Sequence, residues 1–252
     1  NGLQSVLTVN VLTPKKAAAE ETVDTYLSTP ATGHLYKIPV AIIRYFPTKD
    51  GTNVDATATG YTSTLDALRT RQTKVEKKLK FMLEEGSRFR GYLPAPPVPS
   101  LGYRVVKIIN VYEEIPPGLP TATSGVYYPD YKQIFSRHNV KDLVVNQGVK
   151  ESWLEQYASG RIALDESNMA SPITGDVSSS LRTNDDLPVY AKSYTVFGIN
   201  FAQGENNAAR NRGHHLETLL TYANVLQDRN DVLFQESFIG RDTSSAFLQG
   251  RC

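Results

Sequence analysis

An almost unbroken apolar run from Tyr36 to Phe46 constrains the fold of this chain more than any other feature. Its centre, Val40-Ala41-Ile42-Ile43, shows no apolar–polar alternation, which is typical of a strand covered on both faces in a parallel sheet. Other apolar or β-branched runs alternate with helical stretches. The predicted strands are residues 5–12, 36–46, 103–112, 148–157 and 194–201. This order predicts a single α/β domain over residues 1–252, with a largely parallel or mixed sheet of about five strands and helices on both faces.

Two long helices are expected between and after these strands. In residues 62–85, apolar side chains such as Leu65, Leu68 and Leu79 recur at helical spacing. The lysines and acids between residues 74 and 80 are predicted to form the solvated face of that helix. A second helix is predicted over residues 205–227, directly after the last strand.

Ligands of parallel α/β sheets bind beyond the carboxyl ends of the strands, so residues at those ends are the first candidates for a site. The strand ends supply the following polar residues: Asn110, Tyr112, Glu113, Glu114, Glu155, Tyr157, Asn200 and Gln203. Residues 158–192 are polar, with little periodicity. Because loops of that length in a domain are usually functional or disordered, we expect an ordered loop that crosses the active edge.

The segment Gly213-His214-His215-Leu216-Glu217 contains two of the four histidines of the chain. His214 and Glu217 are three residues apart on the predicted helix and therefore share one face. On a helical wheel that face points away from the apolar stripe, while His215 is expected at its boundary. With Glu166, or an acid of Glu113-Glu114, as third ligand, the pair could hold a divalent metal such as zinc and leave a position open for water. A structural helix surface is the alternative interpretation of the same residues.

Catalytic roles follow from that hypothesis. Glu166 would be a metal ligand or the general base, and Asn168 or Arg212 would stabilise developing negative charge. A pair of carboxylates formed by Glu155 and residues 165–166 is a further possibility, suited to glycoside hydrolysis. The chain has no Gly-x-Ser-x-Gly nucleophile motif and no glycine-rich phosphate loop, which argues against serine hydrolases and nucleotide-dependent enzymes.

Composition limits the partners and the compartment. The net charge is +1 and basic residues are scattered among acidic ones, so no nucleic-acid partner is expected. No apolar run approaches the roughly 18 residues needed to cross a bilayer. A lone cysteine, Cys252, excludes an internal disulfide, although it could pair beyond residue 252. Fourteen tyrosines and many Thr, Ser and Asn residues favour an extracellular or cell-surface protein.

Residues 166–172, Glu-Ser-Asn-Met-Ala-Ser-Pro, and residues 213–217 resemble motifs of an uncharacterised family of secreted bacterial proteins. The resemblance covers mainly residues 140–240 and implies secretion, and that the long loop and the final helix belong to one site. The family carries no known activity. The candidate metal ligands, together with the expected secretion, lead us to expect a metal-assisted hydrolase that acts on an extracellular polymer, glycan or peptide. The alternative is a non-catalytic carbohydrate-binding or cell-surface interaction module.

Overall fold

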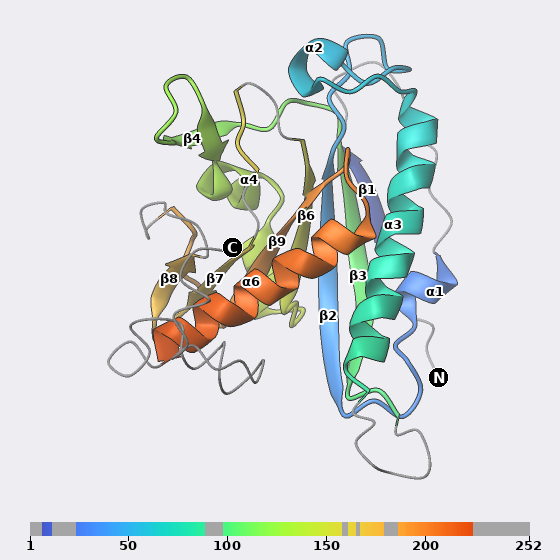
Figure 1. Ribbon diagram of the computed structural model, residues 1–252, viewed down its shortest axis with the longest axis vertical. Helices are drawn as coiled ribbons and strands as arrows, with labels where there is room; N and C mark the ends of the chain where they lie inside the picture. Colours follow the sequence, from blue (N-terminus) through green and yellow to red (C-terminus); the bar gives the residue numbers. More distant parts are fainter. Residues whose placement is uncertain are drawn as a thin grey trace, which may run out of the picture.

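A seven-stranded sheet, in the order β1-β3-β2-β6-β9-β7-β8, forms the centre of the molecule (Figure 1). This computed structural model describes residues 7–11, 24–88, 98–157, 161–164, 167–178 and 186–223. Its strands are β1 Leu7–Val11, β2 Tyr36–Tyr45, β3 Leu101–Val111, β6 Glu151–Gln156, β7 Ser167–Ser171, β8 Gly175–Ser178 and β9 Tyr194–Asn200. A separate two-stranded ribbon consists of β4 Pro117–Pro120 and β5 Tyr127–Pro129.

The predicted fold class is confirmed: the chain is a single α/β domain with a mostly parallel sheet. The five strands expected from the sequence correspond to β1, β2, β3, β6 and β9, which pair in parallel. The two further strands, β7 and β8, form an antiparallel hairpin, and β7 also pairs antiparallel with β9. They lie within residues 158–192, which the sequence predicts as a loop. This segment extends the sheet instead of only crossing its edge.

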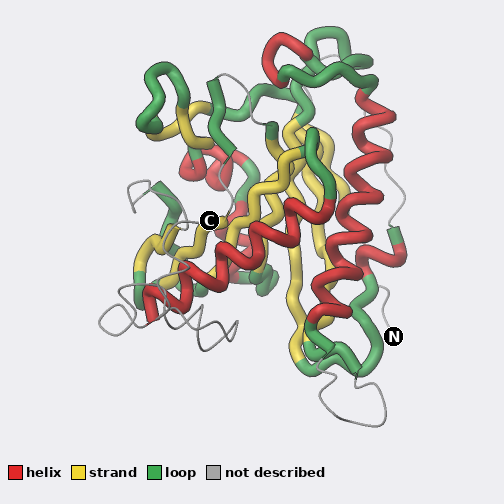
Figure 2. The backbone as a smooth tube through the Cα atoms, viewed as in Figure 1, coloured by secondary structure: helices red, strands yellow, loops and turns green. Residues whose placement is uncertain are grey.

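Helices cover both faces of the sheet, as Figures 1 and 2 show. On one face lie α3, Leu65–Gly86, and α6, Glu205–Ala223. The other face is covered by two shorter helices, α4, Tyr131–Arg137, and α5, Val140–Val145. The single-turn helices α1, Thr25–Ser28, and α2, Ala56–Thr59, precede β2 and α3.

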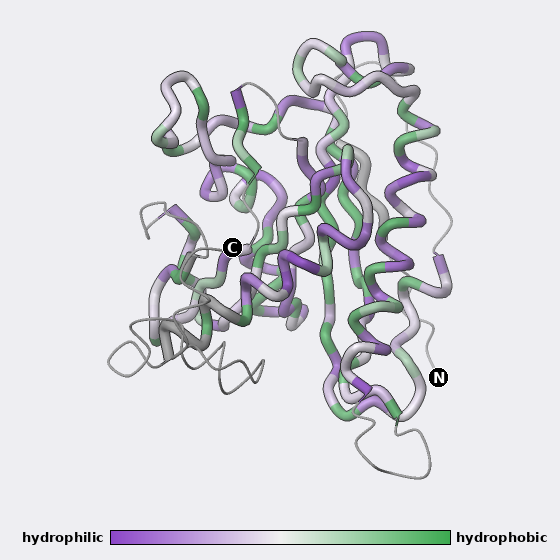
Figure 3. The backbone as a smooth tube through the Cα atoms, in the orientation of Figure 1, coloured by the Kyte–Doolittle hydropathy of each residue, from purple (hydrophilic) through white to green (hydrophobic). Residues whose placement is uncertain are grey.

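Apolar side chains from the strands fill two layers. In Figure 3 much of the trace of the central strands has the colour of hydrophobic residues. Ile42 and Trp153 pack beneath α3 and α6, where Leu79 is part of the same cluster. Ile43 and Leu154 are the next residues along their strands, so they face the other way and pack with α4 and α5. This alternation is the two-residue period of a strand with both faces covered.

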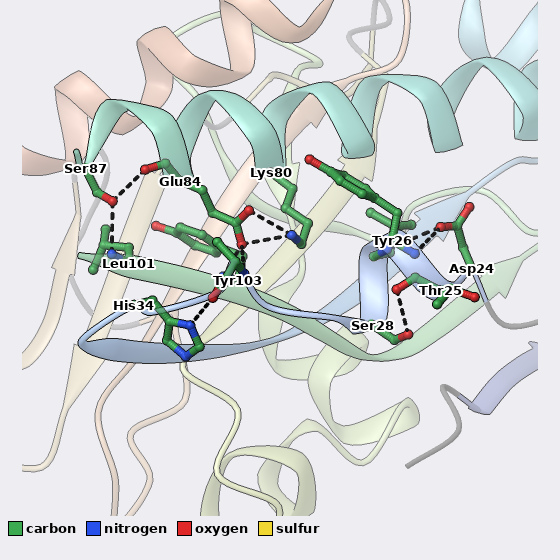
Figure 4. Close-up of polar contacts among 12 residues, drawn as sticks. Asp24, Thr25, Tyr26, Ser28, His34, Lys80, Glu84, Ser87, Leu101 and Tyr103 are labelled. Atoms are coloured by element: carbon green, nitrogen blue, oxygen red, sulfur yellow. Dashed lines mark hydrogen bonds and ion pairs between the residues drawn. The ribbon is translucent and has the colours of Figure 1, made fainter. Parts of the chain in front are cut away.

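Thr64 caps the N-terminus of α3, because its side chain accepts a hydrogen bond from the backbone N–H of Ala67. The prediction that its charged residues are solvated is wrong for Lys80 and Glu76, which are buried. Figure 4 shows how Lys80 is accommodated: its ammonium donates to both oxygens of Glu84 at 2.8 Å and lies 4.5 Å from the centre of the Tyr26 ring. Glu84 in turn accepts from the backbone N–H of Tyr103 on β3. Charge alone could not show that this part of the helix faces the sheet.

The sequence also favours helices over residues 15–27 and 231–238, but residues 15–23 and 231–238 lie outside the described residues. Within the part of the chain that the structure describes, no helix combines the length and apolar character needed to span a membrane.

Candidate functional site

Asn168, predicted to stabilise negative charge, lies on β7 and is buried. Its Nδ2 donates to the hydroxyl of Tyr131 on α4 at 3.2 Å. In the sheet Asn168 is opposite Val196, which packs in the same apolar layer as Tyr131. The Asn168 side chain therefore faces the α4 side of the sheet.

Arg212, assigned the same role, lies on α6 against the opposite face. Its Nη1 donates to Glu151 Oε1 at 2.8 Å, and its guanidinium lies 5.0 Å from the centre of the Phe197 ring. Phe197 belongs to the layer beneath α3 and α6. The sheet therefore separates Arg212 from Asn168, so the two side chains do not meet at one site. Their catalytic roles remain predictions.

The two histidines of α6 differ in burial, and not in the way that the helical wheel predicts. His215 is buried, not at the boundary: its ring contacts Phe197 edge-on and its Nε2 lies 3.5 Å from the Thr195 hydroxyl. Burial, reinforced by the nearby Arg212 charge, lowers the pKa of His215 to about 3. His214 is half-buried. The helical-wheel prediction was wrong because the buried face of α6 also includes a polar residue. Asn211, one turn before His215, is buried and donates to the carbonyl of Gly198.

The proposed metal ligands cannot be assembled from what is described. Glu166 lies outside the described residues, and the side chain of Glu217 is not described either. Among the described residues, no group of three or more His, Cys, Asp or Glu side chains is arranged to hold a metal ion. The metal site remains a prediction.

A polar cleft of about 360 Å³ lies at the carboxyl ends of the parallel strands, and we call it the carboxyl-edge cleft. Its walls come from three segments, those after β2, β3 and β6. The lining residues are Lys49, Asp55, Thr57, Ala58, Glu114, Tyr157, Arg161 and Ile162. The volume is within the range of roughly 300–1,000 Å³ that is usual for small-molecule sites.

The topology explains why a cleft opens at this place. The chain leaves β2 toward α3 on one face of the sheet and leaves neighbouring β3 toward α4 on the other. Loops that depart to opposite faces leave a crevice between them, which is where open α/β sheets bind ligands.

Tyr157 is the most buried of the polar residues that line the cleft. Its side chain is almost fully buried, and its hydroxyl oxygen accepts the backbone N–H of Ile115 at 2.9 Å. Burial raises the pKa of Tyr157 to about 12, so the hydroxyl keeps its proton. Since the oxygen already accepts a bond from the backbone, its O–H is left to donate to another acceptor.

The rim carries two cations and two carboxylates. Lys49 Nζ pairs with Asp55 Oδ2 at 2.9 Å. The Lys49 ammonium, together with the backbone N–H groups of Thr57 and Ala58, lowers the pKa of Asp55. Glu114 and Arg161 are both exposed on the wall. The cleft therefore presents donors and acceptors with no net charge.

The strand-end rule finds Glu114 and Tyr157 from the sequence but misses the rest of the lining. Lys49, Asp55 and Thr57 lie in the segment between β2 and α3, and Arg161 lies beyond the end of β6. Asp-x-Thr, in which the aspartate caps a helix, was the available signal for Asp55.

Comparisons with known proteins add no relative: no family model, no curated protein and no solved structure matches this chain.

Proposed function

We propose that the carboxyl-edge cleft binds a neutral, hydroxyl-rich ligand, a segment of an extracellular glycan. The observation that carries this proposal is the hydroxyl of Tyr157, a buried residue that lines the cleft and whose oxygen already accepts the Ile115 N–H. Such a group is preorganised to donate to a ligand oxygen.

The balance of charge supports a neutral ligand. Lys49 and Arg161 would donate to sugar hydroxyl oxygens, while Glu114 would accept from sugar hydroxyl groups. An anionic ligand would meet two carboxylates and a cationic ligand two cations, so neither gains a net electrostatic advantage. Sugar hydroxyls, which both donate and accept, can use all of these groups.

Calorimetric titration of the protein with glycan oligosaccharides tests the proposal, after a glycan array has selected them. Glu114→Gln is expected to weaken binding about tenfold or more, because a hydrogen bond to a charged group contributes about 1.5–3 kcal/mol. Glu113→Gln is the matched control: the neighbouring carboxylate pairs with Arg137 instead of lining the cleft. Absence of glycan binding, or equal losses in both variants, would overturn the proposal.

Metal-assisted hydrolysis by His214, Glu217 and Glu166 is a second proposal, favoured by the position of β7. This strand begins at Ser167, opposite Phe197, whose ring contacts the His215 ring on α6. Glu166 directly precedes Ser167 in the sequence.

Metal analysis of the purified protein separates this second proposal from the first. Stoichiometric zinc that is lost in His214→Ala but kept in His34→Ala would support it. A metal-free protein that binds glycan without cleaving it would leave only the first proposal.

A further inference from the structure

Three charged side chains are buried together between α3 and the sheet: Arg44, Glu76 and Glu155, which we call the buried triad. Each is fully shielded from solvent. Arg44 on β2 binds Glu76 on α3 with two hydrogen bonds, from Nε at 2.7 Å and from Nη2 at 2.6 Å. Its Nη1 lies 3.4 Å from the side-chain oxygen of Asn110 on β3. The guanidinium is therefore already committed to one carboxylate.

The second carboxylate, Glu155 on β6, has a poorer environment. Arg44 Nε lies 3.7 Å from its Oε2, and neither of its oxygens has a hydrogen-bond partner among the described residues. On its other side, β9 places the apolar Ile199 opposite it. The charged groups that face Glu155 are thus Arg44 from β2 and Glu76 from α3. One guanidinium serves two carboxyl groups.

We propose that Glu155 is protonated in the folded protein at neutral pH and donates this proton to the Glu76 carboxylate, so that a proton helps to hold α3 on the sheet. An unpaired carboxylate in such a site would cost far more than a neutral acid. The shared proton gives the triad one positive and one negative charge and supplies the missing hydrogen bond. Burial, followed by the neighbouring Glu76 charge, raises the pKa of Glu155 well above its ordinary value.

The triad is well placed to influence the cleft. On the same helix, one turn before Glu76, Gln72 donates to the carbonyl of Phe201, and Arg71 donates to the same carbonyl. The Phe201 ring packs against the Tyr157 ring with their centres 5.8 Å apart. Loss of the proton would therefore act on α3, the helix that contacts Phe201 and, through it, Tyr157 in the lining of the carboxyl-edge cleft. The inference itself does not depend on what that cleft binds.

The sign of the pH dependence follows from the raised pKa. Above the ordinary pKa of a glutamate, the unfolded chain has released this proton while the folded protein retains it. The contribution of Glu155 to stability therefore falls as pH rises, until the folded protein also releases the proton. A single retained proton changes the unfolding equilibrium constant by about tenfold per pH unit over that window.

Urea unfolding of the full chain between about pH 5 and pH 9 tests this dependence. Glu155→Gln keeps a neutral donor of the same shape, and we expect it to fold and to lose this part of the slope. Glu151→Gln is the matched control, because Glu151 is a buried acid of the same strand that pairs one-to-one with Arg212. It should keep the wild-type slope. Equal slopes in wild type and Glu155→Gln would overturn the proposal.

Infrared spectroscopy of the wild-type protein supplies a test that needs no variant. At pH 8 the protonated carboxyl of Glu155 should give a carboxylic C=O band that disappears on unfolding. A spectrum with carboxylate bands alone would overturn the proposal even if Glu155→Gln does not fold.

Discussion

The two faces of the sheet are stabilised by different chemistry. Beneath α3 and α6, two buried cations and one half-buried cation each meet an acid: Arg44 pairs with Glu76, Lys80 with Glu84, and the half-buried Arg212 with Glu151. Beneath α4 and α5, aromatic rings pack against one another: Tyr131 meets Phe135 edge to face, and Phe135 packs against Tyr194 at a tilted angle. We call these the ion face and the aromatic face.

On the ion face, the long helices bring charged side chains against the sheet. Arg44 and Glu151 come from the strands, and their partners Glu76 and Arg212 come from α3 and α6. Desolvation of a buried ion pair can cost more than the attraction between the two charges returns, so such pairs need not add net stability. The aromatic face instead gains its stability from apolar area and ring geometry. Replacement of single residues should therefore have different consequences on the two faces.

Removal of one buried partner on the ion face should have the largest effect. Arg44→Met leaves Glu76 without its cation in a fully buried site, and we expect unfolding free energy to fall by about 3–5 kcal/mol. Arg137→Met, which removes an exposed pair with Glu113, should cost less than about 1 kcal/mol. Urea unfolding measures both. Similar small losses would mean that burial does not govern the cost.

Each face also contains a neutral histidine, which should make both faces sensitive to acid. Burial lowers the pKa of His138 to about 4 and of His215 to about 3. As pH falls below about 6.5, the unfolded chain binds protons that the folded protein cannot, so stability falls by about 1.4 kcal/mol per pH unit per group. His138→Gln and His215→Gln should each flatten this acid limb in unfolding titrations. An unchanged limb in both would show that other groups control acid unfolding.

A smaller effect is expected from one hydroxyl on the aromatic face. Tyr45 is buried, and its hydroxyl lies 3.3 Å from His138 Nε2. Tyr45→Phe should cost about 1 kcal/mol, the usual net contribution of one hydrogen bond. Tyr36→Phe is the control, because Tyr36 is exposed and should show no change in thermal or urea unfolding. A loss as large as that of Arg44→Met would erase the contrast between the faces.

The smallest change in unfolding free energy is expected when all three residues of the buried triad are replaced together. The combination of Arg44→Met, Glu76→Leu and Glu155→Leu replaces the buried triad with apolar groups of similar size. Because no charge is left unpaired, we expect unfolding free energy to stay within about 1 kcal/mol of wild type, or to rise. Calorimetry with urea unfolding checks this result. A loss of several kcal/mol would show that the ions contribute net stability.

The fold could be predicted from the sequence wherever periodicity was strong. Five parallel strands and the helix at residues 65–86 follow from apolar runs and helical spacing. The β7–β8 hairpin does not, since Ser167-Asn168-Met169-Ala170-Ser171 is short and polar yet largely buried. Its strand conformation depends on pairing with β9, which follows later in the chain.

The site was predictable only in outline, for a related reason. The rule that ligands bind at strand ends identifies Glu114 and Tyr157, but it cannot say which long side chains enter from loops. The sequence does not distinguish a charged side chain that is solvated from one that is buried against a partner. Arg212 shows this ambiguity, because its partner Glu151 is distant in the sequence. For Lys80 the partner Glu84, four residues later, could be expected from helical spacing, but the burial of the pair could not.

The strand order has a consequence for synthesis of the chain. β2 is the earliest of the long strands, yet it pairs on one side with β3 and on the other with β6, whose Glu151 lies beside Val40. A ribosome must therefore release about 110 further residues after Val40 before the second edge of β2 is covered. Until then the nascent chain exposes an apolar strand edge of the kind that attracts foreign strands. We expect this protein to depend on chaperone protection during that interval.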